Sequence, residues 1–178
     1  MRKNKNKRYN KKGFTLIELL TVISIMGVIG AIVVSVITIT LRGSAKTDLM
    51  EYARQNSDAA LSQMVKSIRY AASLNNPVSC VPSVTVSAIT ITSLTDYAKT
   101  TYSCAGGTIS SNSATASEPL IDTNSLKVSA CSFVCSQPTL NDPPTITILY
   151  TVSPKIAGNF AETNFTIPFQ TSVTMRNY

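Results

Sequence analysis

The sequence contains no histidine, no glycine-rich phosphate-binding loop, and no serine or cysteine with an evident base partner beside it. General acid–base catalysis and activated nucleophiles depend on such groups. The carboxylates after Glu18 are scattered singly along the chain, so no pair of acids offers itself for catalysis either. We therefore expect no enzymatic activity, no cofactor and no metal site.

Acidic residues are absent from the first 13 residues, which hold seven of the 16 lysines and arginines. Residues 14–178 carry nine basic and nine acidic side chains and are therefore neutral, although the whole chain has a formal charge of +7. The basic charge thus forms a short head at the start of the chain. A DNA-binding surface would need a basic face on a folded domain, so we predict no specific nucleic-acid partner.

Charge and proline are both missing from a long apolar segment. No charged residue lies between Glu18 and Arg42, and residues 14–41 contain no proline. As a helix that rises about 1.5 Å per residue, residues 19–41 can cross a hydrocarbon core of roughly 30 Å. A buried helix that is apolar on all sides would need a much larger soluble protein around it. The positive-inside rule keeps the basic head in the cytoplasm and directs the chain after Leu41 outward.

An ordinary secretory signal and a plain single-pass anchor are two alternatives for this segment. A secretory signal has a shorter apolar part that is closed by an A-x-A-like cleavage site, and no such site follows here. Neither alternative accounts for Gly13 directly before the segment or for Glu18 within it.

The stretch KKGFTLIELL, residues 11–20, resembles the prepilin processing signal of type IV pilins and of the related pseudopilins of secretion systems. The resemblance implies that a membrane prepilin peptidase cuts between Gly13 and Phe14 and then N-methylates the new amino terminus of Phe14. Many major pilins carry a helix-breaking proline in the second half of the apolar segment, and this chain lacks one.

The resemblance also implies a structural role. The precursor would stay in the inner membrane until a cytoplasmic ATPase and a platform protein assemble it with other pilin subunits into a surface filament. The leading interpretation is a minor pilin of a type IV pilus. A pseudopilin of a type II secretion or DNA-uptake system carries the same signal and is an alternative. An adhesin or ligand-binding module displayed on a filament is an alternative from a different class.

The presence of the acidic residue Glu18 inside the apolar segment requires a physical explanation. A carboxylate in hydrocarbon costs on the order of 2 to 3 kcal/mol on insertion scales, and a cation can offset that cost. The amine created at Phe14 by the cut stays charged when methylated, so Glu18 is expected to pair with the Phe14 amine of a neighbouring subunit and to set its docking register. Two alternatives are local: Thr15-Leu-Ile-Glu18 also matches a capping box, and Glu18 could reach its own chain's Phe14.

After Leu41 the sequence predicts an amphipathic helix and then a β-rich domain. Apolar residues recur at three- and four-residue steps, and Asn75-Asn76-Pro77 is expected to stop the helix. Beyond Pro77, short β-type runs alternate with turn-rich linkers such as 105–119. We expect four or five strands in one antiparallel sheet over the apolar stripe of the helix, from the runs 84–92, 102–104, 126–134, 145–152 and 165–175.

The predicted fold class is therefore α+β, with a long N-terminal α-helix packed against a C-terminal antiparallel β-sheet. The predicted divisions of the chain are a leader that the peptidase removes, a transmembrane and assembly helix, an amphipathic continuation of that helix, and an extracytoplasmic β-rich domain: 1–13, 14–41, 42–76 and 77–178.

Four cysteines lie in the distal part of the chain, in a segment rich in serine and threonine: Cys80, Cys104, Cys131 and Cys135. An even number in an extracytoplasmic domain favours two disulfides. Reduced buried thiols are an alternative, and a four-thiolate zinc site fits the spacing poorly. Three pairings are open, and we favour Cys131 with Cys135 and Cys80 with Cys104.

Overall fold

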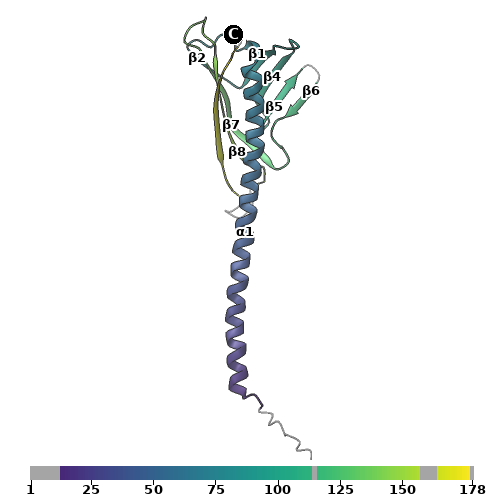
Figure 1. Cartoon of the computed structure of the whole chain (residues 1–178), viewed down its shortest axis with the longest axis vertical. Helices are drawn as coiled ribbons and strands as arrows, with labels where there is room; N and C mark the ends of the chain where they lie inside the picture. The colour runs from purple at the N-terminus through teal and green to yellow at the C-terminus, as the bar shows by residue number, and fades with distance from the viewer. Residues whose placement is uncertain (1–12, 114–115, 157–163, 177–178) are drawn as a thin grey trace, which may run out of the picture. The chain divides into compact units, whose positions relative to one another are not determined.

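The computed structural model describes residues 13–113, 116–156 and 164–176. Within these residues one α-helix, α1 (Leu16–Arg69), is followed by nine β-strands (Figure 1). The chain divides into two compact units, Met1–Ser44 and Ala45–Tyr178. The first unit holds the start of α1, and the second holds the rest of α1 and all nine of these strands. The predicted leader, residues 1–13, lies outside the described residues except for Gly13.

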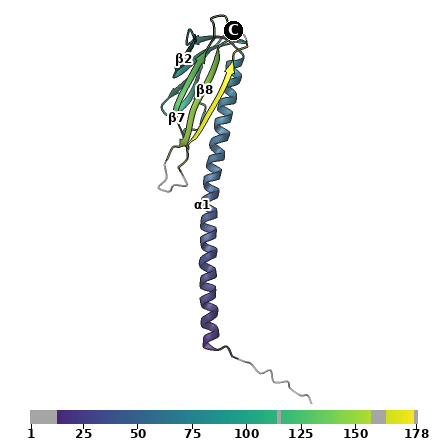
Figure 2. The ribbon, with the colours of Figure 1, turned by 90° about the vertical axis from the view of Figure 1, so that its left-hand side faces the viewer.

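The strands form two antiparallel sheets, with the orders β1-β3-β4-β5-β6 and β2-β7-β8-β9. Three strands of the second sheet, β2, β7 and β8, are labelled in Figure 2. This topology confirms the α+β class with a long helix packed against antiparallel strands, but the prediction of a single sheet of four or five strands is wrong. The strands are β1 (Ala71–Asn76), β2 (Ser83–Val86), β3 (Ala88–Ser93), β4 (Lys99–Ala105), β5 (Thr108–Ser113), β6 (Ala116–Pro119), β7 (Leu126–Ser136), β8 (Thr145–Pro154) and β9 (Ile167–Thr174).

The run 84–92 was expected to be one strand, and it supplies one strand to each sheet. In β2 the more buried side chains stand at even positions, Val84 and Val86, whereas in β3 they stand at odd positions, Ile89 and Ile91. Successive side chains of a strand point to opposite faces, so a single straight strand cannot bury both sets. The shift of phase therefore marks the place where the chain changes sheets.

The second half of α1 buries one stripe of side chains, which its periodicity predicts for all but Ser57: Ala53, Ser57, Ala60, Met64 and Ile68. These residues follow at steps of three and four, so they share one face of the helix. The helix ends at Arg69, earlier than expected, because residues 71–76 pair with β3 as strand β1. The apolar positions of residues 71–76 are compatible with a helix as well as with a strand. The hydrogen bonds to β3 favour the strand.

The predicted linker 105–119 contains strands β5 and β6 in its described part. Gly106 and Gly107 join β4 to β5 with φ angles of 61° and 76°. Both values are positive, as a two-residue hairpin turn of type I′ requires. The hairpin was missed because its strands are rich in serine and threonine, and only Ile109 is a large, fully buried apolar residue there.

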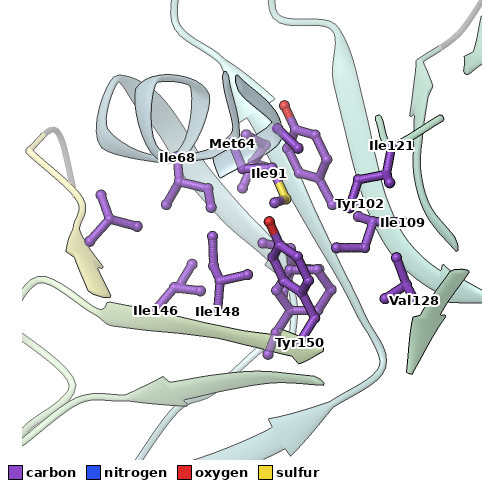
Figure 3. Close-up of a cluster of buried hydrophobic side chains, with 14 of the residues drawn as sticks. Met64, Ile68, Ile91, Tyr102, Ile109, Ile121, Val128, Ile146, Ile148 and Tyr150 are labelled. Atoms are coloured by element: carbon purple, nitrogen blue, oxygen red, sulfur yellow. The ribbon is translucent and has the colours of Figure 1, made fainter. Parts of the chain in front are cut away.

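The core lies where α1 meets both sheets. Figure 3 shows Met64 and Ile68 of α1 among side chains of the first sheet and of the second, namely Ile91, Tyr102 and Ile109, and Ile146, Ile148 and Tyr150. Each of these side chains is at most 2% exposed. The stripe on α1 is therefore covered from two sides, which one sheet alone would not achieve.

All four cysteines form disulfides, but the pairing is Cys80–Cys135 and Cys104–Cys131. The favoured pairing was therefore wrong, and so were the alternatives of reduced thiols and a zinc site. Cys135 points into the core and is fully buried. The register of β7 against β8 shifts between Ser129 and Ser132, where Ala130 has a φ of 48°. Such a bulge redirects the chain, and Cys131 bonds across to β4 instead of along its own strand.

Tyr150 of β8 connects the second sheet to the backbone of α1. Its hydroxyl donates to the carbonyl oxygen of Ser57 at 3.0 Å, and this hydrogen bond is buried. Its ring stacks on Phe169 of β9 with the ring centroids 5.4 Å apart. Burial raises the pKa of the Tyr150 phenol above its ordinary value, because the ionised form would lose its hydration.

Tyr150→Phe is expected to lower the free energy of unfolding by about 1 kcal/mol, since it removes one buried hydrogen bond and keeps the ring. Because the pKa of Tyr150 is higher in the folded chain, the neutral phenol contributes to the free energy of unfolding. This contribution is fully present below the pKa of about 10 that tyrosine has in the unfolded chain, and it is lost as the pH rises toward the pKa in the folded chain. Between about pH 8 and about pH 11, the free energy of unfolding measured with urea should therefore fall further for the wild type than for Tyr150→Phe. Tyr97→Phe, at a position 73% exposed, is the control; equal losses in wild type and Tyr150→Phe would overturn the assignment.

Candidate functional site

Thr15 caps the N-terminus of α1. Its carbonyl oxygen accepts a hydrogen bond from the amide of Leu19 at 3.2 Å, and its Oγ1 accepts one from the amide of Glu18 at 3.4 Å. Thr15 is therefore the N-cap residue, and Glu18 occupies the third helical position. A negative side chain in the first turn also suits the helix dipole.

Only half of the capping box is present. In the complete box the Glu18 carboxylate would accept a hydrogen bond from the amide of Thr15. Among the described residues, the Glu18 carboxylate makes neither this hydrogen bond nor any ion pair, and Glu18 is exposed. The amine that sequence reasoning assigned to it does not exist in the uncut chain, where the nitrogen of Phe14 is a peptide amide.

The other polar side chains of the apolar segment are satisfied within the helix. Each of the five hydroxyl groups between residues 16 and 41 donates to a carbonyl oxygen three or four residues earlier, at 2.8 to 2.9 Å: Thr21, Ser24, Ser35, Thr38 and Thr40. A helix can enter hydrocarbon only if such groups have partners. Glu18 is thus the one polar side chain of the described segment 16–41 that still needs a partner.

The apolar side chains of this segment point outward on all sides. The helix is long and apolar enough to cross a membrane, and none of its most apolar window is buried. Phe14 and Leu16, for example, are both 81% exposed. A buried helix of a soluble domain is therefore excluded, because an apolar surface of this extent must be covered by lipid or by other chains.

Gly13 is not required by the fold. A Cβ atom added to Gly13 would meet nothing within 4 Å, and its φ is not in the left-handed region. The same holds for Gly27 inside the helix. Any requirement for a small residue at position 13 must therefore come from a molecule that binds this stretch.

The remaining predicted site residues are the four cysteines, which serve the fold as disulfides. Among the described residues, no three histidine, cysteine, aspartate or glutamate side chains gather where they could hold a metal ion. Asp122 accepts a hydrogen bond from the hydroxyl of Tyr52 at 3.1 Å. The pKa of Asp122 is lowered, first by the backbone amide of Asn124.

Sequence reasoning missed a cavity of about 830 Å³ between the last turns of α1 and the first sheet. Its walls come from α1, from β3 and β4 and the turn between them, and from the end of β5. No local motif announces it, because its residues lie up to 50 positions apart: Gln63 and Ser113 are the two extremes.

Residues 8–34 match the model of the prokaryotic N-terminal methylation motif, the cleavage and methylation signal of type IV pilins and pseudopilins. The match includes Gly13, Phe14 and Glu18, and it confirms the resemblance of KKGFTLIELL to a prepilin signal. No curated protein and no solved structure matches the chain. The motif supports a type IV pilin-like or pseudopilin precursor and says nothing about the β-rich unit.

Proposed function

We propose that this chain is a structural subunit, a minor pilin, of a type IV pilus or a related filament. A prepilin peptidase cuts between Gly13 and Phe14, removes residues 1–13 and N-methylates Phe14. Residues 14–41 hold the precursor in the inner membrane and later join the filament. The amphipathic continuation 42–76 and the β-rich domain 77–178 then lie outside the cytoplasm.

The unpartnered carboxylate of Glu18 carries this proposal. Every hydroxyl of the apolar segment has a partner in its own helix, whereas the Glu18 carboxylate has none among the described residues. Its cost in hydrocarbon falls when a cation comes within ion-pairing distance. The cut supplies one cation per chain, at Phe14. A neighbour's amine can bind there only at one axial position, so the ion pair would define how a new subunit docks.

Two further observations support the proposed placement of the chain. The basic head favours the cytoplasmic side for the amino terminus. The two disulfides suit an oxidising compartment for the rest. Assembly then requires a cytoplasmic ATPase and a platform protein that extract the subunit, together with other pilin subunits that receive it.

The fate of the chain in a cell that builds such filaments tests this function. We expect shearing to release the mature chain with the filaments, in a small amount relative to their principal subunit. A mature chain that stays in the membrane fraction would instead identify a pseudopilin. Full-length chain in the membrane, uncut in the presence of the peptidase, would rule out both and leave the single-pass anchor.

A further inference from the structure

The helix–sheet groove, defined as the 830 Å³ cavity between the last turns of α1 and the first sheet, has the size of a small-molecule site. Ile91 and Leu94 supply apolar wall, and Tyr70 lies at the end of the helix with 48% of its surface exposed. A smaller cavity of about 210 Å³ shares Gln63 and Ser113 with it and extends it toward β6. The groove is thus elongated, with room for more than one ring.

The groove carries one cation and one anion that do not pair with each other. Among the described residues, the ammonium group of Lys66 makes no hydrogen bond or ion pair. Asp96 accepts a hydrogen bond from the amide of Ala98 at 3.2 Å. The hydroxyl of Ser93, first, and this amide lower the pKa of Asp96, so its carboxylate stays ionised and able to accept further hydrogen bonds. The net charge of this lining is therefore zero, and the smaller cavity that extends the groove adds the carboxylate of Glu118.

Most other polar groups of the lining are hydroxyls, which both donate and accept hydrogen bonds. They come from the helix, from the strands and from the β3–β4 turn: Ser67, Ser93, Thr95, Thr100 and Ser113. The amide of Gln63 adds two donors and an acceptor. Such a lining matches a neutral ligand that has many hydroxyl groups of its own.

Tyr97 lies in the β3–β4 turn between the lining residues Asp96 and Ala98, but it does not itself line the groove. Its φ of 53° lies in the left-handed region, which costs a bulky residue roughly 1 to 2 kcal/mol and which glycine would adopt freely. Its ring is nevertheless 73% exposed, so packing within the chain does not compensate for this strain. This conformation instead belongs to the β3–β4 turn, which the amide of Ser93 closes by donating to the carbonyl oxygen of Ala98 at 2.9 Å.

We propose that the helix–sheet groove binds a neutral oligosaccharide. Sugar rings have an apolar face that stacks on tyrosine, here Tyr70, and an edge of hydroxyls that bind carboxylate, ammonium and amide groups, here Asp96, Lys66 and Gln63. A peptide strand fits less well, because β3 and β4 are paired on both sides and offer no free edge. The proposal concerns the unit Ala45–Tyr178 alone and is independent of filament assembly.

The test uses the full chain in a polyoxyethylene detergent, which has no sugar headgroup. Cellotriose and maltotriose are the probes, and ligand-observed saturation-transfer NMR together with calorimetry reports binding. We expect a dissociation constant on the order of 1 mM or below for at least one probe. The proposal is overturned if neither sugar gives a binding signal, and also if trialanine binds and the sugars do not.

Two variants locate the site. Tyr70→Ser removes a lining ring that is 48% exposed, so we expect a small change of Tm together with at least about a tenfold loss of affinity, near 1.4 kcal/mol. Asp96→Asn should weaken binding in the same way. Tyr52→Phe changes a tyrosine that does not line the groove and should leave affinity unaltered. Sugar binding that persists in both groove variants would show that the groove is not the site.

Discussion

Glu18→Gln should abolish incorporation of the chain into filaments while leaving cleavage intact. The substitution keeps the size of the side chain and a residue type that the capping box accepts, but it removes the negative charge. A neighbour's amine would then stand unpaired in hydrocarbon, and loss of one partner of a buried ion pair costs about 3 to 5 kcal/mol, on the order of 100-fold or more in the docking equilibrium. Quantitation of the chain in sheared filaments against the membrane fraction measures this effect.

Thr15→Ala is the matched control for the helix cap. It removes the Oγ1 atom that accepts from the amide of Glu18 and leaves the carboxylate in place. Loss of an N-cap costs typically about 1 kcal/mol, so incorporation should fall far less than in Glu18→Gln. Because Glu18→Gln also removes the insertion cost of a charge, poor insertion cannot explain its defect. If Thr15→Ala lowered incorporation more than Glu18→Gln, the role of Glu18 would be local capping of the helix.

Gly13→Val should stop the processing of the chain. A pocket that accepts glycine excludes a branched side chain, so we expect the cleaved fraction to fall by a factor on the order of 100. Nothing in the described chain opposes the substitution, since an added Cβ meets no atom within 4 Å. Gel mobility and the mass of the amino-terminal peptide measure the result: the variant should keep residues 1–13.

Gly27→Ala is the control for this experiment. Gly27 has equally open surroundings, and alanine raises the helix propensity there by about 1 kcal/mol. Cleavage should therefore be normal. If Gly13→Val were still cut while Gly27→Ala behaved as the wild type, the peptidase would not read position 13, and the proposed cleavage site would be lost.

The features that the sequence predicted well depend on near neighbours in the chain. The signal around Gly13, Phe14 and Glu18 is contiguous, and the apolar segment after it is defined by its composition alone. The buried stripe of α1 follows from helical periodicity, apart from Ser57, a polar residue that periodicity does not expect in a core. These features need no knowledge of distant contacts.

The features that were missed depend on register between distant segments. Residues 71–76 fit a helix locally and become β1 only because β3 lies beside them. The disulfide of Cys104 with Cys131 depends on the bulge at Ala130, which places Cys131 off the regular register of β7. The phase shift between β2 and β3 was visible in the sequence, and it would have indicated two sheets.

The helix–sheet groove is another feature that was missed because it depends on contacts between distant segments. Lys66 is an exposed residue of α1, and it also lines a cavity whose other parts come from β3, the β3–β4 turn, β4 and β5. Tyr97, in the neighbouring β3–β4 turn, has a backbone conformation that favours glycine or asparagine. Sequence alone does not reveal that φ is positive there.

We propose that the carboxylate of Glu18 pairs with an amine that proteolysis creates on another subunit. The distance between a Glu18 carboxylate oxygen and the nearest Phe14 nitrogen, measured in the structure of an assembled filament, tests it most directly. We expect this distance to be about 4 Å or less, the range of an ion pair, with the nitrogen belonging to a neighbouring chain. A carboxylate folded back onto the amide of its own Thr15, with every neighbour's amine out of reach, would contradict it.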